Sequence, residues 1–418
     1  MTQPASSFYG LGIAPKLLDR LDRLGFTKPT PIQEKAIPPA TQGKDLIGVA
    51  QTGTGKTLAF VVPMLQRLAQ TKGRGLIILP TRELALQVDE VFQKVGHPLQ
   101  LRTAVLIGGA AMTRQVTMLR RNPHVIIATP GRLIDHLETQ GLKLHDVRIL
   151  VLDEADRMLD MGFAPQIKRI FAAIPKQRQT MLFSATMPAD IVKLATAQMQ
   201  LPLRVEVAPP GTAAERVKHE LFVVHQTQKS QLLEKVLGEY KGTVLVFTRT
   251  KHGAKKLTRQ LSRIKHTVAE LHSNRSLSQR RAALDGFKSG AYRILVATDI
   301  AARGIDVTGI ELVLNFDLPT TPDDYVHRIG RTGRAGKSGQ AISFATPEQE
   351  KDVRAIERLI HLRIPVTNLP GLPTLPAEHF NDERRPARPR RAPHQGGRRF
   401  GARRPGRRFS SSGPRRRF

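Results

Sequence analysis

The strongest constraint on the fold is a series of short apolar segments, most of which end in a polar or glycine-rich cluster. Six such segments occupy the first half of the chain, at residues 45–50, 75–80, 103–108, 124–130, 149–155 and 180–186. Their continuous apolar character is typical of strands buried on both faces of a parallel sheet. The longer stretches between them, such as residues 82–95, have helical spacing of apolar residues. The alternation therefore predicts βαβ units.

A second series of the same kind begins after two prolines and a glycine at 209–211. Its expected strands lie at residues 219–225, 242–248, 266–272, 292–298, 311–317 and 340–346. We therefore predict an α/β protein with two tandem parallel-sheet domains. The first spans residues 1–208 and the second residues 218–365, with a short linker at 209–217.

The C-terminal end of the chain differs in composition. Residues 384–418 hold 14 arginines and no Asp or Glu, within a chain whose net charge is +31. We expect a disordered, Arg-, Gly- and Pro-rich tail at 366–418, because this composition buries no core. Excess arginine favours a nucleic-acid partner, since guanidinium groups bind phosphates and stack on bases. The tail is either an RNA tether or only a solubilising segment.

Other classes of protein are excluded or disfavoured by what the sequence lacks. The chain has no cysteine, which excludes disulfides and thiolate metal sites. Its first residues lack a signal-peptide pattern, and no apolar run reaches the roughly 18 residues of a membrane span. We therefore expect a soluble, cytoplasmic protein with no membrane partner.

The stretch AQTGTGKT at residues 50–57 follows an expected strand and opens an expected helix. Glycines in this position let backbone N–H groups converge on a phosphate at the positive end of the helix. Lys56 is placed to reach the β- and γ-phosphates, and the Thr57 hydroxyl to serve Mg²⁺. Ala50 stands where the strict pattern has glycine, so a plain glycine-rich turn is the alternative.

The segment ILVLDEAD at residues 149–156 supplies the partner of such a loop. Asp153, at the end of a buried strand, is suited to hold Mg²⁺, and Glu154 to orient or deprotonate the attacking water. Asp160, further along, is expected at a solvated position on the following helix. These residues predict a nucleotide site with Mg²⁺ at the carboxyl edge of the first sheet.

With these motifs in this order, the chain resembles the DEAD-box ATP-dependent RNA helicases over roughly residues 8–345. The run DEADRMLDMGF at 153–163 looks most like the bacterial RhlE-like branch. The resemblance implies two RecA-like domains. The first would carry the adenine-reading motif, the phosphate loop and the DEAD box, and the second the arginine fingers of HRIGRTGRAG at 327–336.

The resemblance also implies roles for individual residues. The catalytic set would be Lys56, Asp153, Glu154, His327, Arg331 and Arg334. Coupling of hydrolysis to domain closure would involve Asp156, which we expect to contact the SAT motif, together with Ser184 and Thr186. ATP would be bound by Phe8, Phe26, Gln33, Ala50, Gln51, Thr52, Gly53, Thr54, Gly55, Lys56, Thr57, Gly304 and Asp306.

RNA contacts are implied by the same resemblance, and they would be made to the backbone without reading bases. The residues are Pro80, Thr81, Arg82, Gly108, Gly109, Thr129, Pro130, Gly131, Arg132, Thr248, Arg280, Thr298 and Asp299. One position departs from the family, which often has Gln where this chain has Leu277, three residues before Arg280. That departure puts one polar contact near the RNA in question.

The expected function is RNA-stimulated ATP hydrolysis that drives local unwinding of short RNA duplexes and remodelling of RNA–protein complexes. Because the phosphate loop and the arginine fingers lie in different domains, hydrolysis should require domain closure. A non-unwinding, ATP-gated RNA clamp and a DNA helicase are the alternatives. The expected partners are RNA, with ribosomal precursors or RNA-decay proteins in addition, and the chain is expected to act as a monomer.

Overall fold

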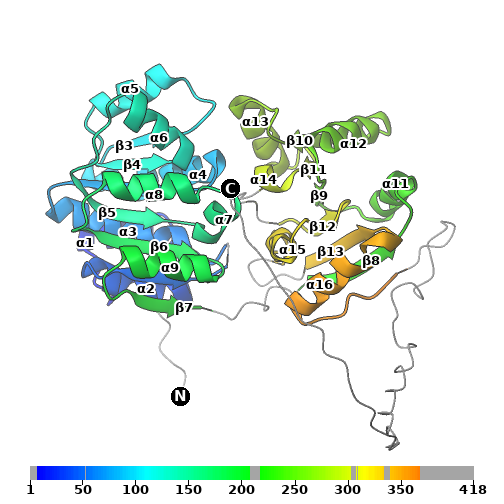
Figure 1. Cartoon of the computed structure of the whole chain (residues 1–418), viewed down its shortest axis with the longest axis horizontal. Helices are drawn as coiled ribbons and strands as arrows, with labels where there is room; N and C mark the ends of the chain where they lie inside the picture. Colours follow the sequence, from blue (N-terminus) through cyan, green and yellow to red (C-terminus); the bar gives the residue numbers. More distant parts are fainter. Residues whose placement is uncertain are drawn as a thin grey trace, which may run out of the picture.

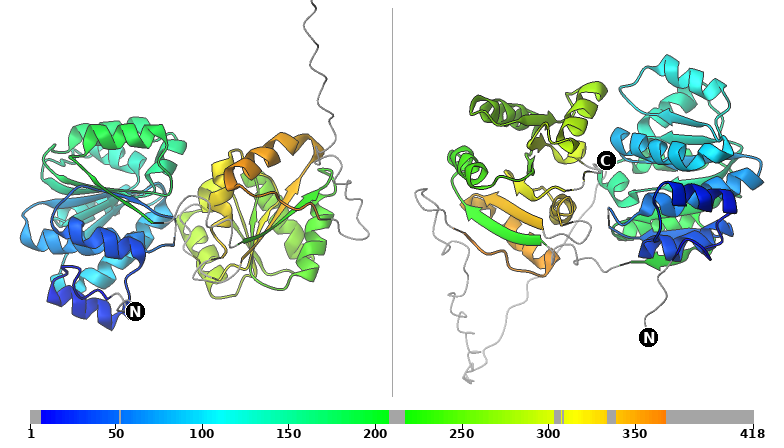
Figure 2. Two further views of the ribbon diagram at one scale, coloured as in Figure 1. Left: turned by 90° about the horizontal axis from the view of Figure 1, so that it is seen from below. Right: turned by 180° about the vertical axis from the view of Figure 1, so that it is seen from behind.

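The computed structural model describes residues 7–51, 53–207, 217–302, 307, 309–333 and 339–367. It contains two parallel sheets, each covered by helices on both faces (Figures 1 and 2). The expected site residues Thr52, Gly304, Asp306 and Arg334 lie outside the described ranges. So do nearly all of the expected linker and tail.

The first sheet has seven parallel strands in the order β3-β4-β2-β5-β6-β1-β7. Its strands are β1 (Leu46–Val49), β2 (Arg74–Ile78), β3 (Thr103–Leu106), β4 (Val125–Ala128), β5 (Val147–Leu152), β6 (Gln179–Ser184) and β7 (Leu203–Glu206). All six strands predicted in this half are present. The analysis missed β7, an edge strand whose side chains are mostly exposed and whose sequence, LRVE, has no apolar run.

Helices cover both faces of this sheet and build a core on each. One core includes residues of α1 (Pro15–Arg23), α2 (Pro31–Thr41), α3 (Lys56–Gln70) and α4 (Arg82–Gly96). The other includes residues of α6 (Pro130–Thr139), α7 (Ala155–Asp160), α8 (Ala164–Ala173) and α9 (Ala189–Gln198). The helix predicted at 82–95 corresponds to α4, while α5 (Met112–Arg120) and the short 3₁₀ helix η1 (His97–Leu99) complete this part.

The second sheet has six parallel strands in the order β10-β11-β9-β12-β13-β8. They are β8 (Val217–Val223), β9 (Val244–Phe247), β10 (Val268–Leu271), β11 (Ile294–Ala297), β12 (Leu312–Asn315) and β13 (Gly339–Ala345). All six were predicted from the sequence. Val217, expected as the last linker residue, begins β8, and Val366, at the expected start of the tail, forms a bridge with Leu221.

Alternate side chains of the second sheet point to opposite faces, and both faces are apolar. Each face is therefore covered by its own layer of helices. One layer consists of α11 (Lys229–Glu239) and α12 (Lys251–Arg263). The other consists of α13 (Leu277–Lys288), α14 (Asp299–Ala302), α15 (Pro322–Ile329) and α16 (Glu350–Ile360), which follows the 3₁₀ helix η2 (Pro347–Gln349). Within the described ranges, no helix is long and apolar enough to span a bilayer.

The two sheets face each other through α13 and α15 of the second and α4 and α7 of the first (Figure 1). The Arg280 side chain from α13 pairs with Glu83 of α4, at 2.7 Å between Nε and Oε1. Leu277, at the start of α13, packs against the core formed by α1–α4. The predicted polar clusters therefore lie where the two halves meet.

Candidate active site

The loop between β1 and α3 has the backbone that a phosphate-binding loop requires. Gly53 and Gly55 have φ angles of 87° and 92°, in the left-handed region that favours glycine. The Thr54 hydroxyl donates to the carbonyl of Gln51 at 2.7 Å, which closes the loop on itself. The loop leads directly into α3, whose positive N-terminal end begins at Lys56.

Lys56 and Asp153 lie close together where α3 begins and β5 ends. The Lys56 side chain is only 6% exposed, and its Nζ lacks a hydrogen-bond partner in the described part of the chain. It lies 3.9 Å from Asp153 Oδ1. A buried ammonium group without a hydrogen-bonded partner is costly, so this geometry is suited to an incoming anion such as a phosphate.

Asp153 ends up in an environment that disfavours its charge. Burial raises the pKa of Asp153 to about 6, although the nearby charge of Lys56 opposes the shift. A buried carboxylate whose negative charge is not fully compensated is suited to bind a metal cation. Groups of three or more metal-ligating side chains are absent from the described residues. Mg²⁺ is commonly held by one or two carboxylates, waters and substrate phosphates, a role that a single buried aspartate such as Asp153 can fill.

Glu154 is kept ionised. Burial alone would raise the pKa of Glu154, but the positive charges of Arg157 and Lys56 outweigh it and lower the pKa. Arg157 Nη1 donates to Glu154 Oε2 at 2.9 Å, and both side chains are almost fully buried. Glu154 has a φ angle of 54°, a left-handed conformation that is uncommon outside glycine and that directs it away from the strand path.

The expected contact between Asp156 and the SAT motif is confirmed. Asp156 Oδ2 accepts hydrogen bonds from the backbone N–H groups of Ala185 and Thr186, at 3.0 and 2.9 Å. The Thr186 hydroxyl donates to the same oxygen at 2.9 Å. The backbone N–H of Asp156 in turn donates to Ser184 Oγ at 3.2 Å. These hydrogen bonds tie the start of α7 to the end of β6.

The expected adenine-reading element lies beside the phosphate loop. Gln33 Nε2 donates to the Gly55 carbonyl, and Gln33 Oε1 accepts from the Thr30 backbone N–H, both at 2.9 Å. One amide hydrogen and one lone pair of Gln33 then remain for a base edge. Phe26 is 38% exposed and presents part of its ring, whereas Phe8 is 1% exposed and packs inside the core. Phe8 thus supports this element from within and offers no open ring face.

The second half brings His327 and Arg331 to the same place. The charge of Arg331 helps to lower the pKa of Glu154, so the two groups are close across the boundary between the sheets. Burial, reinforced by Arg157 and Arg331, lowers the pKa of His327 to about 3, so this half-buried imidazole is neutral at physiological pH. His327 and Arg331 are therefore brought to Glu154 and Arg157, beside the end of β5.

Asp299 is engaged inside its own domain. Its two carboxylate oxygens accept hydrogen bonds from Arg328 Nε and Nη2, at 2.5 and 2.7 Å. Arg328 also donates to Asn315 Oδ1 and lies 4.9 Å above the Phe247 ring. The bidentate pair fixes the start of α14 relative to α15. An RNA contact by Asp299 stays a prediction.

A basic cluster marks the expected RNA side of the first half. The Arg82 guanidinium lies against Gly108 and Gly109, so that a Cβ on Gly109 would collide with it. Arg132 Nη1 donates to the Ala110 carbonyl at 3.0 Å. Burial and the positive charge of Arg280 lower the pKa of Arg82. Like charges gathered in this way favour binding of a phosphate backbone.

The remaining RNA candidates sit at the same edges of the two sheets. Thr81 caps α4 by accepting from the Leu84 N–H at 3.3 Å, and Thr129 immediately precedes α6. Thr248 is buried, whereas Thr298 is half-buried. Pro80, Pro130 and Gly131 lie beside them, and a Cβ at Gly131 would meet nothing within 4 Å. Small residues at this edge leave room for a backbone to approach closely.

Two charged residues in the site were missed by the sequence analysis. Arg157 holds Glu154, and its position three residues further along a helix was the available signal. Arg328 clamps Asp299 and lies within the motif HRIGRTGRAG, next to His327. A third support, Gln115, bonds the Ile107 and Ala110 carbonyls and contacts His136, which steadies the loop under Arg82. Nothing in the local sequence around Gln115 indicates this role.

This fold and site define a two-domain nucleotide hydrolase of the helicase class. Residues 30–194 match the family model for DEAD/DEAH box helicases. Residues 228–336 match the model for the helicase conserved C-terminal domain. The chain belongs to the DEAD-box family of ATP-dependent RNA helicases.

The relatives agree with this assignment. The chain is 45% identical over 369 residues to the ATP-dependent rRNA helicase RRP3 of Eremothecium gossypii, covering 87% of this chain and 76% of that protein. Its structure resembles that of Saccharomyces cerevisiae Dbp5 bound to RNA and ADP BeF3, with a TM-score of 0.77, 32% identity and coverage of 86% and 96%. It also resembles Mss116p bound to ssRNA and AMP-PNP, with a TM-score of 0.79, 29% identity and coverage of 86% and 78%. Further RRP3 relatives come from other fungi, so the expected likeness to the bacterial RhlE-like branch is not supported.

Proposed function

We propose that the described residues carry out ATP hydrolysis that depends on closure of the two sheets around RNA. The observation that carries the proposal is the position of Arg331, whose charge reaches Glu154 from the other half of the molecule. Lys56 and the N-terminal end of α3 would bind the phosphates, and Arg331 would stabilise the charge that develops on the transferred group. Glu154, kept ionised, would accept a hydrogen bond from the attacking water.

The residues present fit Mg²⁺, and we propose that Asp153 and Thr57 hold it. The buried Asp153 carboxylate with its raised pKa is the structural support for this assignment. When bound, Mg²⁺ would neutralise charge on the β- and γ-phosphates. His327, neutral at physiological pH, is suited to donate or accept one hydrogen bond near the γ-phosphate.

Strand separation would follow from closure. RNA would lie over the cluster of Arg82, Arg132 and the Gly108–Gly109 turn, and the α13 side of the second sheet would complete its binding surface. The names of the fungal relatives support RNA of the ribosome or its precursors as the substrate class. That choice of RNA, action as a monomer and a cytoplasmic location are parts of the proposal. Release of phosphate would then reopen the two halves.

Glu154→Gln tests the catalytic assignment. The variant should bind ATP normally but hydrolyse it about 10²- to 10⁴-fold more slowly, the usual contribution of a general base, and hold RNA for longer. Asp160→Asn is the matched control, because Asp160 is exposed at the far end of the same helix. Normal turnover by Glu154→Gln would show that another group activates the water.

The substrate assignment needs a separate experiment. Steady-state ATPase assays with RNA, DNA or no polymer, combined with strand displacement on a short RNA duplex, distinguish an RNA helicase from its alternatives. We expect stimulation by RNA alone and displacement that requires ATP. Equal stimulation by DNA would contradict the RNA assignment, and RNA-stimulated hydrolysis without displacement would favour a clamp.

A further inference from the structure

Helix α12 carries an exposed basic face that the ATP and RNA sites do not use. Its sequence, KHGAKKLTRQLSR, has no Asp or Glu, and its buried side of Ala254, Leu257 and Leu261 packs on the second sheet. The basic residues that point outward are Lys251, His252, Lys255, Lys256, Arg259 and Arg263, all of them exposed. The helix lies in the layer opposite α13–α16.

The charges on this face are largely uncompensated. Among the described residues, Lys255, Lys256, Arg259 and Arg263 make no ion pair within 4.0 Å. Two acids beside this face already have partners. Glu234 accepts from Gln260 at 2.8 Å, and Glu270 is buried against Arg275 and His272. Repulsion between uncompensated cations costs stability, and a polyanion would remove that cost.

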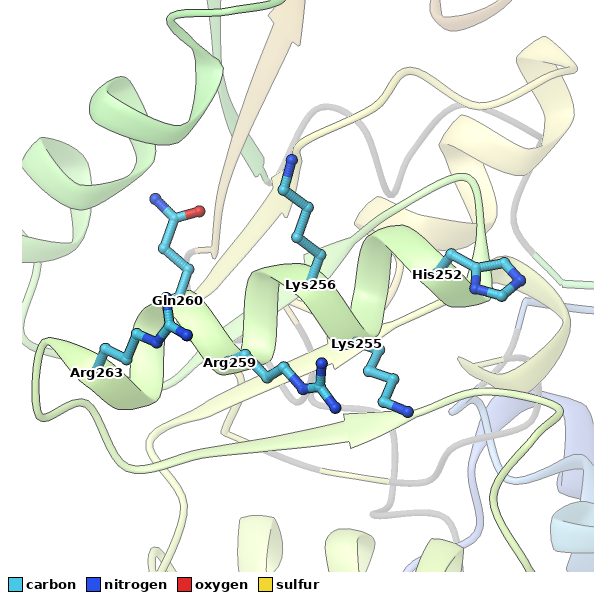
Figure 3. Close-up of a pocket in the computed structure, with 6 residues that line it drawn as sticks. All are labelled: His252, Lys255, Lys256, Arg259, Gln260 and Arg263. Atoms are coloured by element: carbon cyan, nitrogen blue, oxygen red, sulfur yellow. The ribbon is translucent and has the colours of Figure 1, made fainter.

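The shape of the face suits an extended ligand. Lys255, Arg259 and Arg263 form a ridge along α12, with a hollow on each side. Figure 3 shows Lys255 and Arg259 reaching to one side of the helix and Lys256 and Gln260 to the other. Residues four apart on a helix rise by about 6 Å, which is comparable with the spacing of successive phosphates in a nucleic-acid strand.

The ridge is also continuous with the expected RNA side of the second half. Helix α12 starts directly after Thr250, which caps it by accepting from the Gly253 N–H at 3.0 Å, and Thr248 lies two residues earlier. Lys251 at the first turn donates to Asn274 Oδ1 at 3.1 Å. A strand that passes Thr248 would meet the start of the ridge on leaving the expected RNA site between the two sheets, which is called the cleft below.

We propose that the basic ridge of α12, formed by Lys255, Arg259 and Arg263, is a second binding site for the phosphate backbone of RNA, outside the cleft. It holds the part of the substrate that flanks the segment bound between the two sheets. An RNA is favoured over an acidic protein because the outward face of α12 from Lys251 to Arg263 is polar and charged, and the exposed apolar residue beside it, Ile264, lies beyond the last turn of the helix. The inference rests on the proposed RNA-helicase function.

The test is the triple variant Lys255→Gln, Arg259→Gln and Arg263→Gln in the full chain. Glutamine keeps helix propensity, so the variant should fold. The matched control is Lys351→Gln, Arg358→Gln and Arg363→Gln, three exposed cations on and just after α16 in the opposite layer. The affinity for RNA is measured as a function of salt concentration. One RNA is short and fills only the cleft. The others are the same RNA extended at its 5′ or its 3′ end, with the extension either single-stranded or duplex.

We expect the α12 variant to bind the short RNA like wild type and to bind one extended RNA about 10- to 100-fold more weakly at low salt. Its slope of log affinity against log salt should be shallower by about 2, or 0.7 for each of three phosphate contacts on a single strand. The control should match wild type. The extended RNA whose affinity falls identifies which end of the RNA the ridge binds and whether that end is single-stranded or duplex.

Unchanged affinity and slope for every extended RNA would overturn the inference, as would an equal loss in the α16 control. Capture of an acidic protein by α12 with unchanged RNA binding would overturn it as well. Failure of the proposed function is distinguishable, because wild type would then show no RNA-stimulated ATPase with the short RNA. The ATPase rate on that RNA also confirms that the α12 variant is folded.

Discussion

The carboxylate of Asp156 should hold the SAT segment in place, and its removal should cost both stability and coupling. Its Oδ2 accepts three hydrogen bonds, two from backbone N–H groups and one from the Thr186 hydroxyl. Its Oδ1 accepts a fourth, from the Arg157 N–H at 3.0 Å. A hydrogen bond to a charged acceptor is worth about 1.5–3 kcal/mol.

Three variants separate these contributions. Thr186→Val removes one donor to this charged acceptor and should lower the free energy of unfolding by about 1.5 kcal/mol, the lower end of that range, because Thr186 is half-buried. Asp156→Ala leaves the surrounding backbone N–H groups without their acceptor. Because the Ala185–Thr186 segment is half-buried, water replaces some of the lost hydrogen bonds, and the free energy of unfolding should fall by about 3 kcal/mol. Asp156→Asn should lie between them, because whichever way the amide turns, its NH₂ group faces a donor.

Urea unfolding followed by circular dichroism measures the stability of each variant, with ATPase and strand-displacement rates measured in parallel. If the segment couples hydrolysis to closure, Thr186→Val should keep most of its ATPase rate and lose strand displacement. A Thr186→Val variant as unstable as Asp156→Ala, or an Asp156→Ala variant as stable as wild type, would refute the assignment of the cost to these bonds. A Thr186→Val variant with normal displacement would refute the coupling role.

Further predictions concern the phosphate site, its titration and the tail. Lys56→Ala should lower ATP turnover by at least about 10²-fold, since it removes the buried cation that meets the phosphates. The control Lys44→Ala, at an exposed position, should leave turnover unchanged. Nucleotide-binding and ATPase assays compare the two variants. Because the folded-state pKa of Asp153 is raised to about 6, the folded protein binds more protons than the unfolded chain between pH 4 and 6, so this group lowers stability as the pH rises through that window. Asp153→Asn should remove up to about 3 kcal/mol of that dependence, measured as the difference between the two unfolding curves across the window, and an unchanged difference would contradict the shift. Removal of residues 384–418 should weaken RNA binding and flatten its salt dependence, and an unchanged slope in a titration would show that the tail is only solubilising.

The strands of this protein could be predicted because a parallel strand that is buried on both faces has an unbroken run of apolar residues. The exposed edge strand β7 has no such run, and pairing with β1 alone defines it. The site was predictable where motif and position coincide, as at Lys56 and Asp153. Gln33 bonding Gly55, Arg157 holding Glu154 and the burial of Phe8 were not, because they depend on side-chain packing that spacing does not encode.

The bond from Gln33 to Gly55 has a consequence for how the nucleotide is sensed. The expected base-reading residue Gln33 bonds the loop that we expect to receive the phosphates, so a ligand that strengthened or weakened this bond would change the free energy of the loop. By thermodynamic reciprocity, phosphates that reshape the loop change the affinity for the base by the same factor. A triphosphate on another base, or adenosine without its phosphates, would therefore bind without the coupling free energy that ATP gains.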